Sequence, residues 1–453
     1  MILFIKEKRT CFLLLFIIFF TASAYSQTEE RRVISNVIDL RECLRIGLEN
    51  NFDLQIARNQ ELVSENNVTL GNAGYLPQVS VSSGYNLRSS NTDQIPAEGD
   101  EVVENRNSNT QTLDAGINLN WSLFEGFRVQ TNYKRLKELQ SAGELYTRLE
   151  MENLIANLTA EYYNYVQQQI RLGNLQYAVS LSKERLRIVE ARYQVGSLSR
   201  LDLQQAKVDF NADSSQLIQQ YEILNRSRIK LNELMGVDVE SEFIAQDTTI
   251  IFNESLAKDE LFDRTMAQNT FLQISESNLT LSELELRNLR SRNYPYLRLN
   301  AGYGFTHYNY NSGNLERQRN WGPNVGLTLG YTLFDGFNRK REQKNQQIII
   351  RNRELEVERD KLVIESDFAN MWMAYQNNIE LTNLEIESLE NATINYEIAM
   401  ERYRIGDLSG IELREAQNSL LEAEQRLLTA QYNTKLYEIS LMQISGSITT
   451  FLQ

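Results

Sequence analysis

Few side chains in this sequence could carry out acid–base, nucleophilic or metal chemistry. The chain contains one histidine, His307, and two cysteines, Cys11 and Cys43. A transition-metal site usually combines several histidine and cysteine ligands, and a serine nucleophile needs a histidine with an acidic partner. The carboxylates recur at helical spacing, which is typical of a solvated helix face. The sequence therefore predicts a protein that is not an enzyme and that has no cofactor and no metal.

The chain is acidic, with 60 Asp and Glu residues against 46 Lys and Arg residues and a net charge of −14. Nucleic-acid binding requires basic patches, so no nucleic-acid partner is expected. An acidic balance suits a secreted or envelope protein whose inner surfaces repel anions or attract cations.

The first residues have the pattern of a secretory leader. Lys6, Lys8 and Arg9 precede an apolar run over 11–20, and small residues follow at 22–24. We predict a signal peptide over 1–24, because a spanning anchor helix, the alternative, needs ~20 apolar residues. Cys43 is then the only cysteine of the exported chain, which excludes an intramolecular disulfide.

The elements of the exported chain are mostly long helices. No proline occurs between Pro96 and Pro295 or after Pro323, and these stretches are rich in Leu, Glu, Gln and Ala. In the first half we expect one helix over 39–73, a long helix over 128–194 and a helix over 200–235. In the second half we expect helices over 258–291, 338–404 and 408–445. Each long helix would pair with two short helices stacked end to end, as in a coiled coil.

The two halves repeat each other. The motif Leu-Phe-Glu-Gly-Phe at 123–127 returns as Leu-Phe-Asp-Gly-Phe at 333–337, and Arg-Tyr-Gln-Val-Gly at 192–196 returns as Arg-Tyr-Arg-Ile-Gly at 402–406. Solenoid and propeller repeats have periods of ~20–50 residues, far shorter than this one. We therefore divide the exported chain into a first structural repeat (25–236), a joining segment expected to form an equatorial belt (237–257) and a second repeat (258–453).

Four segments alternate apolar and small polar residues with a period of two, over 78–87, 113–123, 297–305 and 325–333. They form two predicted β-hairpins, 76–124 and 295–334. Such segments are typical of transmembrane β-strands, although a soluble sandwich has the same alternation. Gly, Ser, Asn and Thr on the polar face favour a water-filled lumen. Aromatic residues that gather at the helix–strand junctions favour a membrane interface; they are Tyr75, Phe124, Phe127, Tyr294, Tyr296, Phe334 and Phe337.

Four strands cannot close a barrel. Open edges in lipid leave backbone groups unpaired, so the missing strands must come from further copies of the chain. Three copies would supply twelve strands. The residues themselves favour an oligomer but do not decide between a trimer and a dimer.

The order of strand, Leu-Phe-x-Gly-Phe junction, long helix and Tyr-x-(Val/Ile)-Gly turn, occurring twice, resembles the TolC family of outer-membrane efflux proteins. The resemblance implies an α+β membrane protein of Gram-negative bacteria. It implies a homotrimer with a twelve-stranded barrel in the outer-membrane lipid and a periplasmic α-helical tunnel. The partners that it implies are a periplasmic adaptor and an inner-membrane pump, either proton-driven or of the ABC type.

The resemblance also assigns residues. It implies that the two turns contact the adaptor; they comprise Val195, Gly196, Ser197, Leu198, Ser199, Ile405, Gly406, Asp407, Leu408 and Ser409. The alternative is that the glycines only end a helix and the serines only begin the next. Glu412 and Glu415 match acidic positions at the tunnel entrance, where a ring of carboxylates favours cations, the alternative being a solvated helix face.

Asp202 and Tyr403 match positions that hold the tunnel of this family closed. The arginine expected as their partner is replaced by Leu408, which leaves Arg200 and Arg414 as possible substitutes.

We expect the exit duct of an efflux system for small molecules. The alternatives are the duct of a type I protein secretion system and, in a different class, a soluble periplasmic coiled-coil scaffold.

Overall fold

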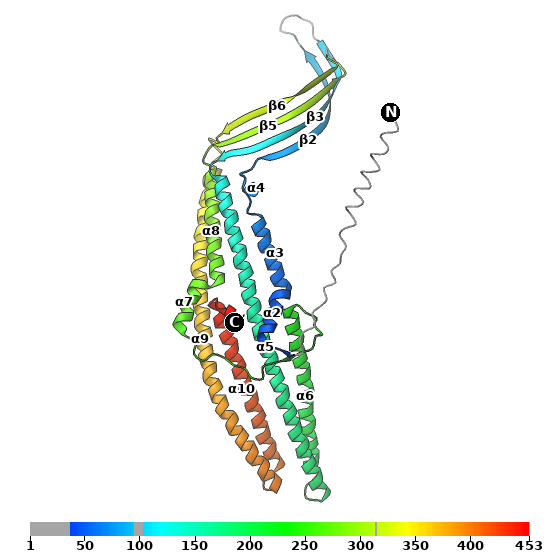
Figure 1. Cartoon of the computed structure of the whole chain (residues 1–453), viewed down its shortest axis with the longest axis vertical. Coiled ribbons are helices and arrows are strands. Elements are labelled where there is room, and N and C mark those ends of the chain that lie inside the picture. The colour runs from blue at the N-terminus through cyan, green and yellow to red at the C-terminus, as the bar shows by residue number, and fades with distance from the viewer. Residues whose placement is uncertain (1–36, 95–102, 313–314, 453) are drawn as a thin grey trace, which may run out of the picture.

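The computed structural model describes residues 37–94, 103–312 and 315–452, so the predicted signal peptide lies outside the described residues. A curved sheet stands at one end of the molecule, and long helices extend away from it side by side (Figure 1). None of the helices in the described ranges has a stretch both long and apolar enough to span a bilayer.

Each repeat contains one long helix, and the two long helices are similar in length. They are α5 (Arg128–Gln194) and α9 (Asn338–Ile405). At 1.5 Å per residue each is roughly 100 Å long. Each begins after a phenylalanine with positive φ, Phe127 at 68° and Phe337 at 61°. The glycine before it also has positive φ, and a Cβ at Gly126 would lie 2.1 Å from the Ser291 carbonyl oxygen. The repeated Gly-Phe pair therefore produces the sharp turn from strand to helix.

Shorter helices pack along each long one, and here two expectations are wrong. The expected helix 39–73 is three helices, α2 (Leu40–Asn50), α3 (Phe52–Asn66) and α4 (Leu70–Ala73). The expected helix 258–291 is two helices, α7 (Lys258–Gln268) and α8 (Thr270–Ser291). The remaining short helices are α6 (Arg200–Met235) and α10 (Gly410–Ile444).

An asparagine lies at one break in each repeat, between α2 and α3 and between α7 and α8. Asn51 Oδ1 accepts the Leu54 N–H at 3.0 Å and so caps α3, while its Nδ2 donates to the Leu234 carbonyl at the end of α6 at 2.9 Å. In the second repeat Asn269 caps α8 and donates to the end of α10 at the Ile444 carbonyl, also at 2.9 Å. Each asparagine thus joins two helices end to end, because a capping side chain satisfies backbone groups that a helix terminus leaves free.

The sheet is continuous across both repeats. Its antiparallel strands run in the order β2 (Gln78–Gln94), β3 (Val103–Glu125), β5 (Tyr296–Tyr310) and β6 (Arg317–Gly330). The strands extend beyond the expected ranges, except that β6 ends before Tyr331 and Leu333. The Tyr296 ring lies where a Cβ of Gly330 would be, and beyond that glycine the chain turns toward α9.

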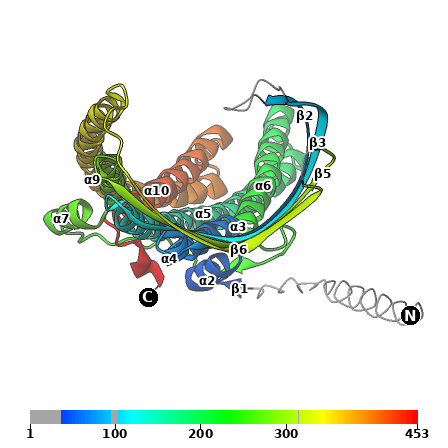
Figure 2. The same ribbon diagram turned by 90° about the horizontal axis from the view of Figure 1, so that it is seen from above.

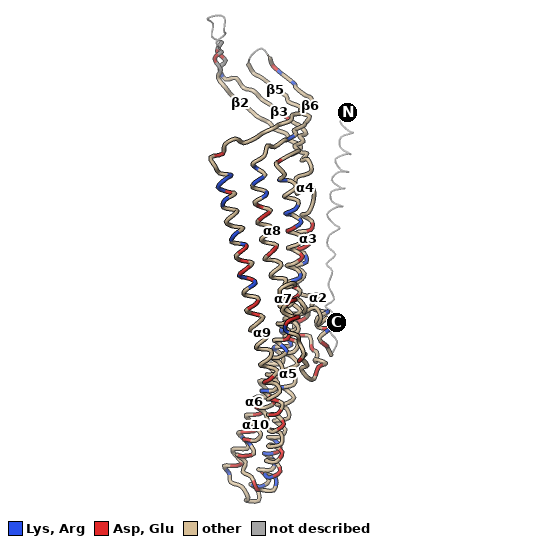
Figure 3. The backbone as a smooth tube through the Cα atoms, turned by 90° about the vertical axis from the view of Figure 1, so that its left-hand side faces the viewer, with Lys and Arg blue, Asp and Glu red and all other residues tan. Residues whose placement is uncertain are grey.

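One face of the sheet is apolar and uncovered in the single chain. Val81, Val325 and Leu329 are each more than 70% exposed. Figure 2 shows the sheet from above as a curved wall, and Figure 3 shows that its strands carry few charges while the helices carry both signs along their length. Among the described residues β2 and β6 are the edge strands of this sheet.

The main core lies at the middle of the molecule. Leu44, Leu158, Tyr162 and Leu231 are buried there, where α2, α5 and α6 meet. The joining segment crosses this region: the Tyr165 hydroxyl donates to the Phe243 carbonyl at 2.7 Å, and the Tyr375 hydroxyl of α9 donates to the Asn253 carbonyl. The strand in this segment is β4 (Ile244–Ala245), which pairs with β1 (Val37–Ile38). The segment therefore ties the two repeats together at mid-height.

Candidate functional site: the tips of the helical hairpins

The two repeated turns lie at the end of the helices farthest from the sheet (Figure 1). Gly196 has φ of 79° and Gly406 has φ of 86°, as required where the helix ends. Space around both glycines is open, and the apolar side chains beside them, Val195 and Ile405, are about four-fifths exposed. Ser409 lies before α10, which begins at Gly410 rather than at 408. Exposed apolar side chains at a tip are typical of a surface that another protein covers.

A capping box begins the helix after each turn. Ser199 Oγ accepts the Asp202 N–H at 3.2 Å, and Asp202 Oδ2 accepts the Ser199 N–H at 2.9 Å. Ser409 and Glu412 repeat this pair, with distances of 3.3 and 3.0 Å. The hydrogen bonds from each serine hydroxyl and backbone N–H hold the pKa of the Asp202 and Glu412 carboxyls below their ordinary values. Both carboxylates therefore have a capping role in the single chain.

The capping boxes make the tips sensitive to acid. Because the pKa of each carboxyl is lowered in the folded chain, its contribution is present above the ordinary carboxyl pKa of about 4 and is lost as the pH falls through the lowered value. We expect faster hydrogen–deuterium exchange, corrected for intrinsic rates, in the first turns of α6 and α10 at pH 3 (roughly one unit below that ordinary pKa) than at neutral pH. A variant with Asp202→Asn and Glu412→Gln should lose this difference. Its persistence there would contradict the assignment.

The other predicted entrance residue, Glu415, lies one turn along α10 from these caps. Its side chain is exposed and makes no hydrogen bond or ion pair with any residue that the structure describes. Glu412 and Glu415 thus lie on the same helix but are not equivalent, because only the first is held in place by the turn.

Tyr403 is buried at the tips, 3% exposed, within an apolar cluster that includes Val189, Met400 and Leu413. The guanidinium of Arg192, at the end of α5, lies 5.3 Å from the Tyr403 ring centroid. Arg192 Nη2 also donates to the Tyr403 carbonyl at 3.1 Å and to the Arg404 carbonyl at 2.9 Å. Arg192 thus caps the C-terminus of α9 and links the two turns.

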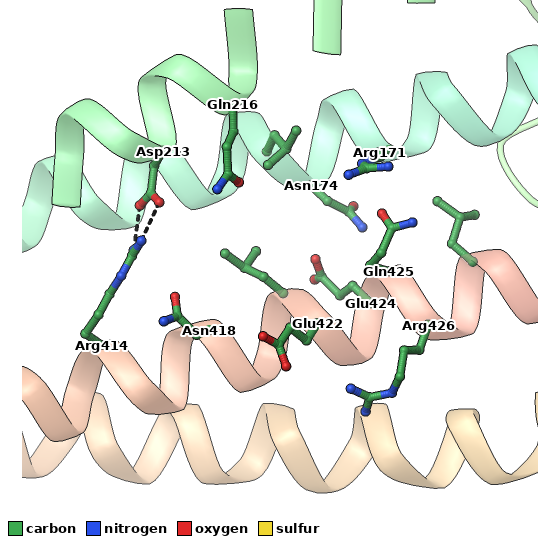
Figure 4. Close-up of a pocket in the computed structure, with 13 residues that line it drawn as sticks. Arg171, Asn174, Asp213, Gln216, Arg414, Asn418, Glu422, Glu424, Gln425 and Arg426 are labelled. Atoms are coloured by element: carbon green, nitrogen blue, oxygen red, sulfur yellow. Dashed lines mark hydrogen bonds and ion pairs between the residues drawn. The ribbon is translucent and has the colours of Figure 1, made fainter. Parts of the chain in front are cut away.

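Neither proposed substitute for the missing arginine is the partner of Tyr403. Arg414 donates to both carboxylate oxygens of Asp213 at 2.7 Å, a pairing drawn in Figure 4. For Arg200 the structure gives no contact with Asp202 or Tyr403. Sequence reasoning missed Arg192, although it is the first residue of the repeated Arg-Tyr motif.

A buried polar network lies above the tips and joins the hairpin α5–α6 to α10. Asp213 is 2% exposed and accepts from Ser182 and Arg414. Gln417 Nε2 donates to Ser182 Oγ at 3.2 Å, and Arg185 Nη2 donates to Asp209 Oδ2 at 2.6 Å. Asp213 and Arg414 also line one end of a cavity of about 600 Å³ (Figure 4). The network connects the two coiled coils within one chain.

The predicted interface aromatics gather where the sheet meets the helices. Phe124 and Phe127 pack edge to face at 5.3 Å, as do Phe334 and Phe337 at 5.4 Å, and Tyr294 contacts Phe127 at 5.9 Å. Tyr75 packs on Tyr133 and accepts the Trp121 indole N–H through its carbonyl at 2.9 Å. The aromatic residues form one band at this level of the molecule.

The family model described as outer membrane efflux protein matches residues 44–237 and 261–447, well over half of the chain and both repeats. The chain belongs to the outer membrane efflux protein family. Members are efflux channels of the Gram-negative outer membrane rather than enzymes, and this protein is such an exit duct.

Curated relatives span nearly the whole chain. The outer membrane protein TolC of Vibrio cholerae is 22% identical over 419 residues, covering 91% of each chain. The pyoverdine export outer membrane protein OpmQ of Pseudomonas putida is 21% identical over 416 residues, covering 90% of this chain and 86% of its own.

Solved structures share the fold. The Campylobacter jejuni CmeC outer membrane channel has a TM-score of 0.76 at 18% identity and covers 93% of this chain and 90% of its own. The open-state MtrE channel of Neisseria gonorrhoeae has a TM-score of 0.70 at 15% identity and covers 91% and 90%.

Proposed function

We propose that three copies of this chain form one duct that carries small molecules from the periplasm to the exterior, in a tripartite system with a periplasmic adaptor and an inner-membrane pump. The observation that best supports this proposal is the exposed state of the sheet. Its apolar face is exposed in the single chain and its edge strands β2 and β6 are open. In lipid each unpaired backbone group costs several kcal/mol, so the edges must pair with further copies. Three copies would close a twelve-stranded barrel.

The band of aromatic residues would lie at the periplasmic interface of the outer-membrane lipid. Aromatic side chains favour this level because one part of the ring contacts lipid and another contacts water. The helices below it would then form the periplasmic tunnel. Exposed apolar side chains on α9, such as Leu362 and Ile398, support their burial against another copy.

The two turns would contact the adaptor. Val195, Leu201, Ile405 and Ile411 are all more than 70% exposed there and present a small apolar surface at the tip. Asp202 and Tyr403 would hold the tunnel closed, and three copies of Glu412 and Glu415 would form an acidic entrance that favours cations.

A deletion strain tests this function. We expect loss of the gene to raise sensitivity to several small toxic compounds by several-fold, with the pattern of secreted proteins unchanged, and expression of the intact chain to restore resistance. Loss of a secreted protein with unchanged sensitivity would instead assign the duct to type I protein secretion. Purified protein that crosslinks as a dimer would contradict the trimer.

A further inference from the structure

Two sets of hydrogen bonds hold the two hairpins of one chain together near their turns. Arg192 at the end of α5 donates to the last carbonyls of α9 and lies over the Tyr403 ring. Above it, Arg414 of α10 forms its paired hydrogen bonds with the buried Asp213 of α6. The first coiled coil of the chain is α5 with α6, and the second is α9 with α10. We call the contact between these two coiled coils of one chain the internal seam.

The repeat allows a comparison with the seam between neighbouring chains, here called the external seam. Gly196 corresponds to Gly406 and the Ser199 cap to the Ser409 cap, an offset of 210 residues. In a ring of repeats, α10 of one chain would contact α6 of the neighbouring chain in the same way as α6 contacts α10 within a chain. The positions equivalent to Asp213 and Arg414 are then Ala423 and Gln204.

The rest of the network is also missing from the external seam. The equivalents of Ser182, Arg185, Asp209 and Gln417 are, in that order, Ala392, Asn395, Ser419 and Lys207. These six positions at the external seam hold one cation and no acid, so they cannot form an ion pair among themselves. Across the internal seam, Arg414 forms a bidentate ion pair with the buried Asp213, and bidentate pairs of this kind are strong. The Arg185–Asp209 pair lies beside the seam, between α5 and α6 of the first coiled coil.

The arginine equivalent to Arg192 is present, but its side chain is engaged elsewhere. Arg402 Nε donates to Asp407 Oδ2 at 3.0 Å, and its Nη2 donates to the Asp407 carbonyl at 3.3 Å. Position 407 corresponds to Ser197 in the first turn, which offers no charge to Arg192. Asp407 therefore holds Arg402 within its own turn, away from the carbonyls of the neighbouring chain's Tyr193 and Gln194.

We propose that the two coiled coils of each chain move as one unit, and that the tunnel opens at the external seams, at the end formed by the turns. Asp407 permits this opening because it keeps Arg402 from bonding to the end of α5 in the neighbouring chain. This inference rests on the trimeric duct proposed above. It makes the internal duplication functional: the seams have the same backbone and different side chains, so only one class of seam separates.

The test is to release Arg402 and measure single-channel conductance of the purified full chain in planar bilayers without an adaptor. Asp407→Ser restores the residue of the first turn, and we expect it to lower the conductance several-fold because Arg402 can then cap α5 of the neighbour. The double variant Asp407→Ser with Arg402→Gln should recover the wild-type value. The mirror change, Ser197→Asp, should capture Arg192 and raise the conductance.

Unchanged or raised conductance in Asp407→Ser would overturn the inference, as would a decrease that persists in the double variant. A second variant avoids dependence on the turns. Gln204→Arg with Ala423→Asp builds the Arg414–Asp213 pair into the external seam and should lower the conductance, while Gln204→Arg alone should not. Equal conductance in these two variants would also overturn the inference. A wild-type chain that forms no pores would instead contradict the proposed function.

Discussion

Tyr403→Ala is expected to raise single-channel conductance several-fold in planar bilayers. The ring is buried between the two turns and lies beneath the Arg192 guanidinium, so its removal leaves a cavity where the turns meet. Truncation of a large buried aromatic side chain costs about 3–5 kcal/mol. The two turns of one chain would then separate, so the tunnel would open at the internal seam as well as at the external seams.

Tyr403→Phe is the matched control. It keeps the ring, its packing and its contact with Arg192, so a much smaller change is expected. Asp202→Asn tests the other proposed gate residue, whose carboxylate also caps α6. Conductance that stays at the wild-type value in both Tyr403→Ala and Asp202→Asn would remove these two residues from the gate.

Asp213→Ala is expected to cause the largest loss of stability. The carboxylate is buried and accepts from Arg414 and Ser182, so its removal leaves the partly buried Arg414 guanidinium without its counter-charge. Arg185 lies nearby, and its Nε and Nη1 already have no hydrogen-bond partner in the part of the chain that the structure describes. Breaking a buried ion pair on one side costs about 3–5 kcal/mol. Urea unfolding of the detergent-solubilised protein, followed by circular dichroism, measures the shift in midpoint.

The control for this prediction replaces both partners. Asp213→Leu with Arg414→Met removes the two charges together and fills similar volume, so most of the stability should return. A single variant that unfolds at the wild-type urea concentration would show that the pair contributes nothing. A double variant as unstable as the single one would show that packing, not the unpaired charge, causes the loss.

Much of the candidate site could be predicted because its signals are local. A proline-free run, a glycine with positive φ and a serine cap determine where α5 ends and α6 begins, and these signals lie within a few residues of one another. The same locality explains the failure at Asn51 and Asn269. An asparagine inside a helical pattern reads as a neutral residue, and only contact with the distant ends of α6 and α10 shows that it separates two helices.

The sequence by itself determined the duplicated plan, the alternation of strands and helices, the turns with their capping residues, and the family. These follow from periodicity and from motifs whose parts are close along the chain. The tertiary structure alone decided which distant charges meet. Arg192 with the end of α9 and Asp213 with Arg414 are each separated by about two hundred residues, and a hydrogen bond between them depends on how the hairpins pack. Local patterns carry no information about that distance, so the packing of the hairpins alone determines which of these charges pair across the seam inside the chain.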